Sequence, residues 1–199
     1  MKKIAVLISN KGKGSNLQAI IDGTKKEKIK GKIVAVVSDT EDALGLRRAR
    51  KHKLPVQIVP NKEDLLPLLK EVNPDYICLA GWKQIILDEV IDEFPHRILN
   101  THPGLIPDTL DGGVKNPDGT DALWNRGKLT DKAMQNFLDQ GCTFAGCTNH
   151  FLTKEFDFGP VLGRCFEKIR KGDTVESLYK RLKVKENKLY VDVLKKLCK

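Results

Sequence analysis

The stretch that decides the fold is residues 4–17, which read IAVLISNKGKGSNL. Its first five residues form a continuous apolar run, which is typical of a parallel strand buried on both faces. The residues that follow are glycine-rich and polar, and Ser15 or Asn16 can cap a helix that starts there. A buried strand, a glycine-rich turn and a helix form the opening unit of an α/β sheet.

The same alternation continues through the first hundred residues. Short apolar runs predict strands, and apolar residues at helical spacing predict helices. The predicted strands cover 4–8, 33–37, 56–59, 76–79 and 97–99, and the predicted helices cover 15–25, 46–51, 62–72 and 85–91. We therefore expect a doubly wound α/β fold with a mostly parallel sheet, in which ligands bind at the carboxyl ends of the strands.

The second half of the chain changes character. Residues 108–140 are rich in Asp, Gly, Asn and Lys, with an amphipathic segment over 130–138. Beyond them, 143–151 and 161–169 predict two antiparallel strands near the C-terminus, and 174–197 predicts a terminal helix. Since there is neither an internal repeat nor a low-complexity linker, we expect one domain over 1–199, with halves 1–100 and 101–199.

Composition narrows the class of protein. The 199 residues carry a formal net charge of +9, and the excess is concentrated at the two ends of the chain. Residues 1–32 have nine lysines against two acids, and residues 164–199 have twelve basic residues against five acids. Two basic ends around an acidic middle favour a local anion site over a uniformly basic nucleic-acid surface. No apolar run reaches the roughly 20 residues of a membrane span, and no signal peptide is expected.

Five cysteines are present, and no two of them form a Cys-x-x-Cys pair. A zinc ribbon or a disulfide framework is therefore not expected. Cys142 and Cys147 are interpreted as strand residues rather than metal ligands, and free thiols fit a reducing cytoplasm.

The glycine-rich turn is a candidate phosphate site. Backbone N–H groups around Gly14, Ser15 and Asn16, together with the dipole of the following helix, can hold a phosphate. The turn is not a Walker loop, and Leu17 stands where a dinucleotide fingerprint has its third glycine. Asp39 could serve as the ribose-binding acid of such a nucleotide fold.

Three polar side chains suit a reaction through a tetrahedral oxyanion. Asn100 and His102 alternate at strand spacing, so both can leave the strand end on one side. Asp157 comes seven residues after His150, in a Glu-Phe-Asp-Phe-Gly-Pro segment. An amide that donates a hydrogen bond, a histidine that moves a proton and an acid that orients it can stabilise such an oxyanion without a metal.

The motifs resemble the folate-dependent formyltransferases. The match is carried, in one order along the whole chain, by Gly12-x-Gly14-Ser15-Asn16-Leu17, Leu79-Ala80-Gly81-Trp82, Asn100-x-His102-Pro103-x-Leu105-x-Pro107, Thr148-x-His150 and Asp157-x-Gly159-Pro160. The resemblance implies a formyltransferase-like Rossmann variant that needs no metal cofactor. It implies that a formyl group passes from 10-formyltetrahydrofolate to the amine of glycinamide ribonucleotide, a step of de novo purine biosynthesis.

The resemblance also implies roles for individual residues. Asn100, His102 and Asp157 take the catalytic positions, and 1–100 becomes the phosphate-binding half. The positions for the substrate phosphate and ribose are Gly14, Ser15, Asn16, Lys183 and Glu186. The positions for the folate are Trp82, Lys83, Gln84, Ile85, Leu87 and His150.

Two features depart from the family pattern. Trp82-Lys83-Gln84 replaces the usual aromatic-Met-Arg, and an insertion over 108–141, with Trp124 and Phe137, lies where the folate tail or a lid would sit.

Four other functions compete with this one. The catalytic domain of a tRNA formyltransferase would suit the positive charge but would need a further C-terminal domain, and a formyltetrahydrofolate hydrolase would need an additional N-terminal one. A nucleotide-binding oxidoreductase would explain Asp39 but not Asn100, His102 or Asp157. A nucleic-acid-binding protein would need aromatic residues interleaved with basic ones.

We expect a cytoplasmic enzyme with small-molecule substrates and no nucleic-acid or membrane partner, and a homodimer stays open.

Overall fold

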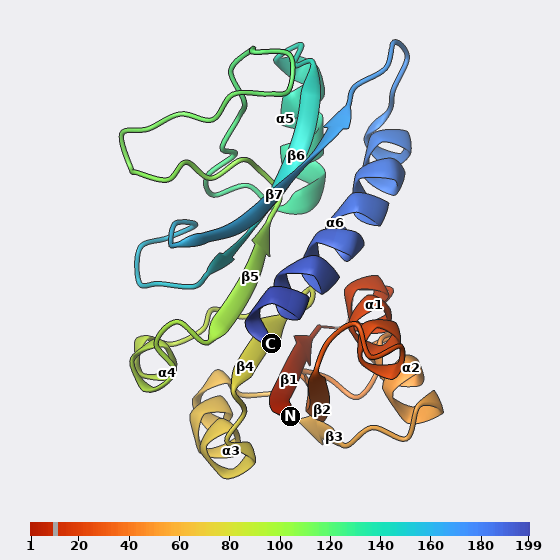
Figure 1. The fold of residues 1–199 in the computed structure, drawn as a ribbon, viewed down its shortest axis with the longest axis vertical. Coiled ribbons are helices and arrows are strands. Elements are labelled where there is room, and N and C mark those ends of the chain that lie inside the picture. The colour runs from red at the N-terminus through yellow and green to blue at the C-terminus, as the bar shows by residue number, and fades with distance from the viewer. Residues whose placement is uncertain (10–11) are drawn as a thin grey trace. The chain divides into compact units, whose positions relative to one another are not determined.

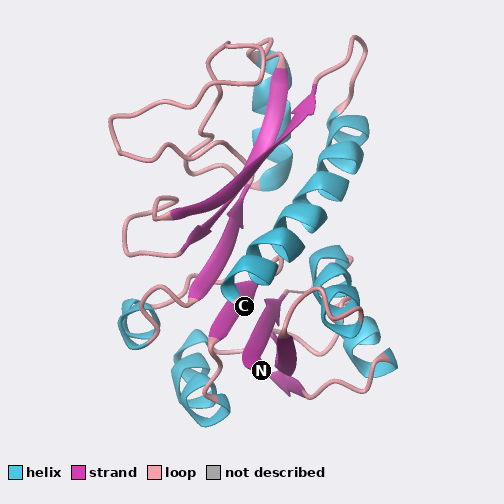
Figure 2. Cartoon of the chain, in the orientation of Figure 1, coloured by secondary structure: helices cyan, strands magenta, loops and turns pink. Residues whose placement is uncertain are grey.

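The computed structural model describes residues 1–9 and 12–199, and its seven strands form one sheet in the order β3-β2-β1-β4-β5-β6-β7 (Figures 1 and 2). The pairs β1–β2, β1–β4, β2–β3 and β4–β5 are parallel, whereas β6–β7 is antiparallel. The predicted α/β fold, with a mostly parallel sheet and antiparallel strands near the C-terminus, is confirmed.

The chain divides into two compact units, residues 1–100 with 190–199 and residues 101–189. The prediction of a single domain stays a prediction. The first unit contains β1 (Lys2–Ile8), α1 (Ser15–Lys25), β2 (Gly31–Ser38), α2 (Leu46–Lys51), β3 (Val56–Ile58), η1 (Lys62–Asp64), α3 (Leu65–Val72), β4 (Tyr76–Leu79) and α4 (Asp88–Glu93). The second contains α5 (Thr130–Asp139), β6 (Phe144–Phe151) and β7 (Val161–Lys168), while β5 (Ile98–His102) and α6 (Val175–Leu197) belong to both.

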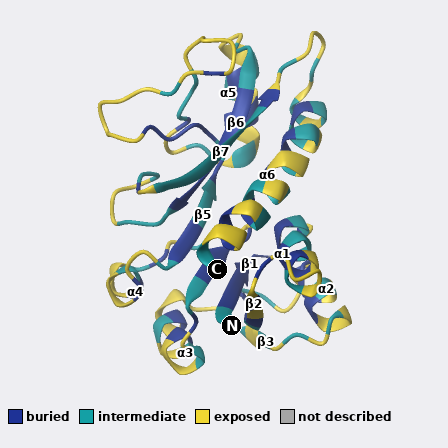
Figure 3. Cartoon of the chain, in the orientation of Figure 1, coloured by how far each residue is buried: buried dark blue, intermediate teal, exposed yellow. Residues whose placement is uncertain are grey.

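The core of the first unit follows from the apolar runs. Residues 4–8 of β1 are all buried, as expected for a strand with neighbours on both edges and side chains packed on both faces (Figure 3). Tyr190 is fully buried in this unit, and its hydroxyl donates hydrogen bonds to the carbonyls of Leu79 and Leu99 at 3.3 and 3.1 Å. The last turns of α6 are thereby fixed to β4 and β5.

Two predicted helices have different bounds in the structure. The segment 62–72 splits into the 3-10 turn η1 and the helix α3, because the ring of Pro67 would clash with the carbonyl of residue 63 in a continuous α-helix. The helix expected over 85–91 begins at Asp88 instead. Leu87 has extended backbone angles, and the acids at 88 and 89 favour a helix N-terminus at that point.

The second unit is built on the β6–β7 ribbon. Its apolar cluster joins that ribbon to α5 and to the first half of α6 through Met134, Phe137, Ala145, Leu178 and Leu182. The amphipathic segment over 130–138 is therefore a core helix of this unit.

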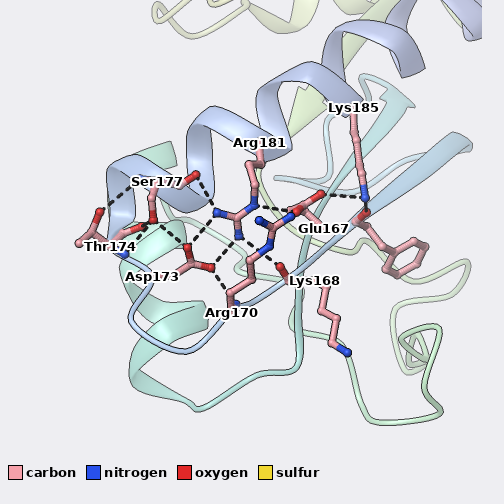
Figure 4. A network of polar contacts seen from close by, with 9 residues as sticks. Glu167, Lys168, Arg170, Asp173, Thr174, Ser177, Arg181 and Lys185 are labelled. Carbon is pink, nitrogen blue, oxygen red and sulfur yellow. Dashed lines mark hydrogen bonds and ion pairs between the residues drawn. The ribbon is translucent and has the colours of Figure 1, made fainter.

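A network of ion pairs holds the start of α6 to β7 (Figure 4). Arg181 of α6 donates to Glu167 of β7 at 2.8 Å and to Asp173, just before the helix, at 2.6 Å. Ser177 also donates to Asp173, and its backbone N–H is capped by the hydroxyl of Thr174. The side chains of Glu167 and Asp173 are at most 8% exposed. These bonds, above all the one from Arg181, hold the pKa of Asp173 far below its usual range.

We expect Arg181→Gln to lower the free energy of unfolding by about 2 kcal/mol, because two largely buried carboxylates lose a charged donor. The effect should depend on pH. Since the pKa of Asp173 is lowered on folding, its stabilisation is complete above the ordinary value of 3.8 and is lost as the pH falls below it. Urea titrations from pH 3 to 7 check this. The exposed Lys188→Gln is the matched control, and equal stability of both variants at pH 7 would contradict the expectation.

Candidate functional site

The glycine-rich turn lies in the first unit, between β1 and α1. Asn10 and Lys11 of this turn lie outside the described residues. Gly14 has φ +69°, and a Cβ there would stand 2.8 Å from the Cα of Gly45, so the close approach of the two backbones requires glycine. Arg48 donates from Nε to the carbonyl of Lys13 at 3.0 Å, which fixes the turn just before α1 begins at Ser15. These contacts fix the backbone just before the first turn of α1.

Ser9 ties together the ends of three strands in this unit. Its hydroxyl donates to Asp39 at 2.7 Å and accepts from the backbone N–H of Lys83 at 3.0 Å. Asp39 thus helps to hold the loops after β1, β2 and β4. Ser9 is not predicted from the sequence as a site residue, because its only signal is its place directly after a buried strand.

The segment expected to contact a folate follows β4. The described residues offer no hydrogen-bond partner to the buried indole N–H of Trp82. Gln84 donates to the carbonyl of Pro60 at 3.1 Å, and Ile85 is 75% exposed. An open depression is lined by Gln84, Ile85 and residues 60–63. This segment offers a buried donor and an exposed apolar side chain, which are both suited to a flat heterocycle.

His102 lies at the end of β5 and is almost completely buried. Asn100, two residues earlier on the same strand, projects from the same face. The His102 Nδ1 atom lies 3.4 Å from Oδ1 of Asp157, and its Nε2 atom lies 2.7 Å from the carbonyl oxygen of Trp124. Both ring nitrogens therefore face oxygen atoms that accept hydrogen bonds.

Asp157 lies in the connection between β6 and β7, where its φ of +50° turns the chain sharply. Its second carboxylate oxygen accepts from the backbone N–H of Gly127 at 2.8 Å. Burial tends to raise the pKa of Asp157, but the hydrogen bond and charge of His102 and the bond from Gly127 outweigh it, so that the pKa is lowered. The carboxylate is therefore ionised and oriented at neutral pH.

The segment 123–127 belongs to the insertion and touches both of these side chains. Besides its carbonyl contact with His102, Trp124 donates from its indole to the carbonyl of Asp157 at 3.0 Å, and its ring lies 5.8 Å from that of Phe158. Arg126 stacks on the Trp124 ring and pairs with Glu155. The sequence does not reveal this role of the segment, because the contact with His102 comes from the Trp124 carbonyl and the contact with the Asp157 carboxylate from the Gly127 N–H, which are both backbone groups.

His150, by contrast, is fully buried in β6. Its Nδ1 atom lies 3.0 Å from the carbonyl of Phe151, so Nδ1 carries the proton that is donated. Burial, followed by the nearby His102, lowers the pKa of His150 to about 4. His150 is therefore a neutral ring at physiological pH.

Lys183 and Glu186, on α6 in the second unit, form an ion pair of 2.6 Å. Burial tends to lower the pKa of Lys183, but the charge of Glu186 outweighs it, and the pKa is raised. The structure thus brings together His102, Asp157 and His150, and separately Lys183 and Glu186. The expected phosphate residues Gly14, Ser15 and Asn16 lie together in the first unit.

Among the described residues, no group of three or more His, Cys, Asp or Glu is arranged to hold a metal ion. In the same part of the chain, no helix is long and apolar enough to cross a membrane.

Comparison with known proteins identifies relatives over the whole chain. The family described as "Formyl transferase" matches residues 2–194. Phosphoribosylglycinamide formyltransferase of Escherichia coli (strain K12) is 34% identical, over 94% of this chain and 82% of that protein. The chloroplastic phosphoribosylglycinamide formyltransferase of Arabidopsis thaliana is 31% identical over 99% of this chain, which spans only 65% of that protein's length. Glycinamide ribonucleotide transformylase 1 from Symbiobacterium toebii superposes with a TM-score of 0.83 at 33% identity, covering 98% of this chain and 86% of that one.

We expect the burial of His150 to make stability depend on pH in the mildly acidic range. Because its pKa falls from 6.5 to about 4 on folding, the unfolded chain takes up the proton first. The stabilisation is complete above pH 6.5 and declines toward pH 4, by about 3 kcal/mol in total. Denaturant titrations across this range check it, and an NMR titration of the ring should show a midpoint near pH 4. The control is His150→Asn, which should flatten the slope; an NMR midpoint near 6.5 would contradict the prediction.

Proposed function

The chain belongs to the formyl transferase family, and from that premise we propose that it transfers a formyl group from 10-formyltetrahydrofolate to the primary amine of glycinamide ribonucleotide. The observation that carries the proposal is the His102–Asp157 contact at 3.4 Å, with Asn100 two residues away on the same strand face. The names of the relatives support this choice of amine acceptor.

The proposed reaction forms one bond and breaks another at the formyl carbon. The amine nitrogen of the acceptor attacks this carbon, and the carbonyl oxygen becomes an oxyanion. Asn100 donates its side-chain amide to that oxygen, and His102 adds a second donor. The bond to the folate nitrogen then breaks, the new amide loses a proton and the folate nitrogen gains one.

In the proposed reaction, Asp157 orients His102 and assists the transfer of the proton that the amine loses. With one oxygen bound to Gly127 N–H and the other facing His102, the carboxylate is held in place. It holds a water that relays the proton from the amine, and its negative charge stabilises the positive charge that develops on the imidazole.

The contact with Trp124 sets a condition on this chemistry. The Trp124 carbonyl and the formyl oxygen accept from the same Nε2 atom of His102. The Trp124 carbonyl therefore leaves Nε2 before the formyl group is polarised, in this proposal.

The proposed binding residues are the positions that the resemblance implies. The N–H groups at Gly14, Ser15 and Asn16 bind the substrate phosphate, and Glu186, positioned by Lys183, binds the ribose hydroxyls. For the folate, the indole N–H of Trp82 has no hydrogen-bond partner among the described residues and offers a donor. Lys83, Gln84, Ile85 and Leu87 belong to the same segment. His150 contacts the folate as a neutral ring. Cytoplasmic location, the absence of a nucleic-acid partner and a homodimer stay predictions.

The purified protein should consume 10-formyltetrahydrofolate only when glycinamide ribonucleotide is supplied, which absorbance of the released tetrahydrofolate can follow. Charged initiator tRNA should not replace this acceptor. Turnover without any amine would indicate a hydrolase, and formylation of the tRNA would indicate the other transferase; either result would overturn the proposal.

Asp157→Asn should keep the fold and the affinity for the phosphorylated substrate but lower kcat by about 100-fold or more, because the amide cannot stabilise a charged His102. Steady-state kinetics measure kcat, and calorimetry measures binding. The matched control is Glu155→Gln, at an exposed acid of the same connection, which should retain turnover. A kcat of Asp157→Asn close to that of the wild type would remove Asp157 from the catalytic set.

A further inference from the structure

Cys147 and Cys165 lie directly opposite each other on the β6–β7 ribbon. Their sulfur atoms are 3.0 Å apart, and both are free thiols. Opposite residues of an antiparallel pair have Cα atoms about 4.5–5.5 Å apart, which falls inside the range of about 4.4–6.8 Å that a disulfide spans. The backbone spacing of the pair is therefore compatible with a disulfide, although the sulfur atoms are in contact and not bonded.

The surroundings of the pair are set by α6. Glu167, two residues after Cys165 and on the same face of β7, accepts from Arg181 and Lys185 of that helix. Lys185 also donates to the carbonyl of Phe166 at 2.6 Å. Arg181 and Lys185 thus fix α6 to β7 through Glu167 and the carbonyl of Phe166. These contacts lie within two residues of Cys165.

The two thiols differ in access and in acidity. Cys147 is 1% exposed, whereas Cys165 is only partly buried. The two sulfur atoms share a hydrogen bond. This bond lowers the pKa of Cys165 despite its burial and the opposing charge of Glu186. The same bond, together with burial, raises the pKa of Cys147. Cys165 is therefore the nucleophile, and Cys147 is the thiol that follows it.

We propose that Cys147 and Cys165 form a peroxide-oxidisable dithiol, a modification site separate from the His102–Asp157 chemistry. The Cys165 thiolate attacks one oxygen of hydrogen peroxide, the O–O bond breaks, and with one proton taken up the products are a sulfenic acid and water. The Cys147 sulfur then attacks the Cys165 sulfur, the S–O bond breaks, and a second water leaves. The two thiols are oxidised to a disulfide as one peroxide is reduced, and a thiol reductant reverses the change.

The test is to treat the full chain with hydrogen peroxide, block the remaining thiols with iodoacetamide and map the peptides by mass spectrometry. The expected result is loss of alkylation at Cys147 and Cys165, a single linked peptide pair between them, and recovery of both thiols with dithiothreitol. Cys147→Ser should stop the reaction one step earlier and leave a sulfenic acid on Cys165 that dimedone traps.

Two controls keep the assignment specific. Cys142→Ser, at a half-buried cysteine of the same unit, should leave the linked pair unchanged, whereas Cys165→Ala should abolish it while circular dichroism shows an unchanged fold. Oxidation of Cys78, Cys142 or Cys198 before the pair, or retention of both free thiols after peroxide treatment, would overturn the proposal. Neither readout requires transferase activity, so the result is independent of the proposed function.

Discussion

The proposed chemistry depends on a single contact, between the imidazole of His102 and the carboxylate of Asp157. Two backbone features make this contact: β5 extends to residue 102, and the positive φ of Asp157 turns the β6–β7 connection toward it. One oxygen of the carboxylate accepts from the N–H of Gly127 and the other faces His102. The two contacts together fix the orientation of the Asp157 side chain. The contacts with His102 and Gly127 therefore both orient the Asp157 carboxylate and keep it ionised.

The sequence predicted most of the first unit because burial there leaves a strong pattern. Residues 4–8 are apolar without interruption, and a strand with two parallel neighbours requires that. Helix ends were harder to predict, since Pro67 acts on a carbonyl four residues away and no local apolar pattern reveals the break. The residue types at 100, 102 and 157 could be selected from chemistry alone, but their distances could not.

The sequence could not predict the contacts that are made by backbone atoms or that depend on strand register. The carbonyl of Trp124 and the N–H of Gly127 contact the site, and nearly every residue has such backbone groups, so no side-chain pattern marks them. Cys147 and Cys165 are eighteen residues apart, and a register shift of one residue would place them on opposite faces of the ribbon. Only the hydrogen-bonded pairing of β6 with β7 decides that they meet.

The two histidines of the second unit show why residue type alone does not assign a role. Each lies at the end of a strand and each is buried, yet their partners differ. His150 donates one proton to the Phe151 carbonyl, and burial keeps it neutral. His102 has an acceptor at each ring nitrogen, one of which is an ionised carboxylate. A ring between two acceptors can gain and pass on a proton without losing its position. The carboxylate beside His102 and the neutral state of His150 therefore favour His102 for the proposed proton transfer.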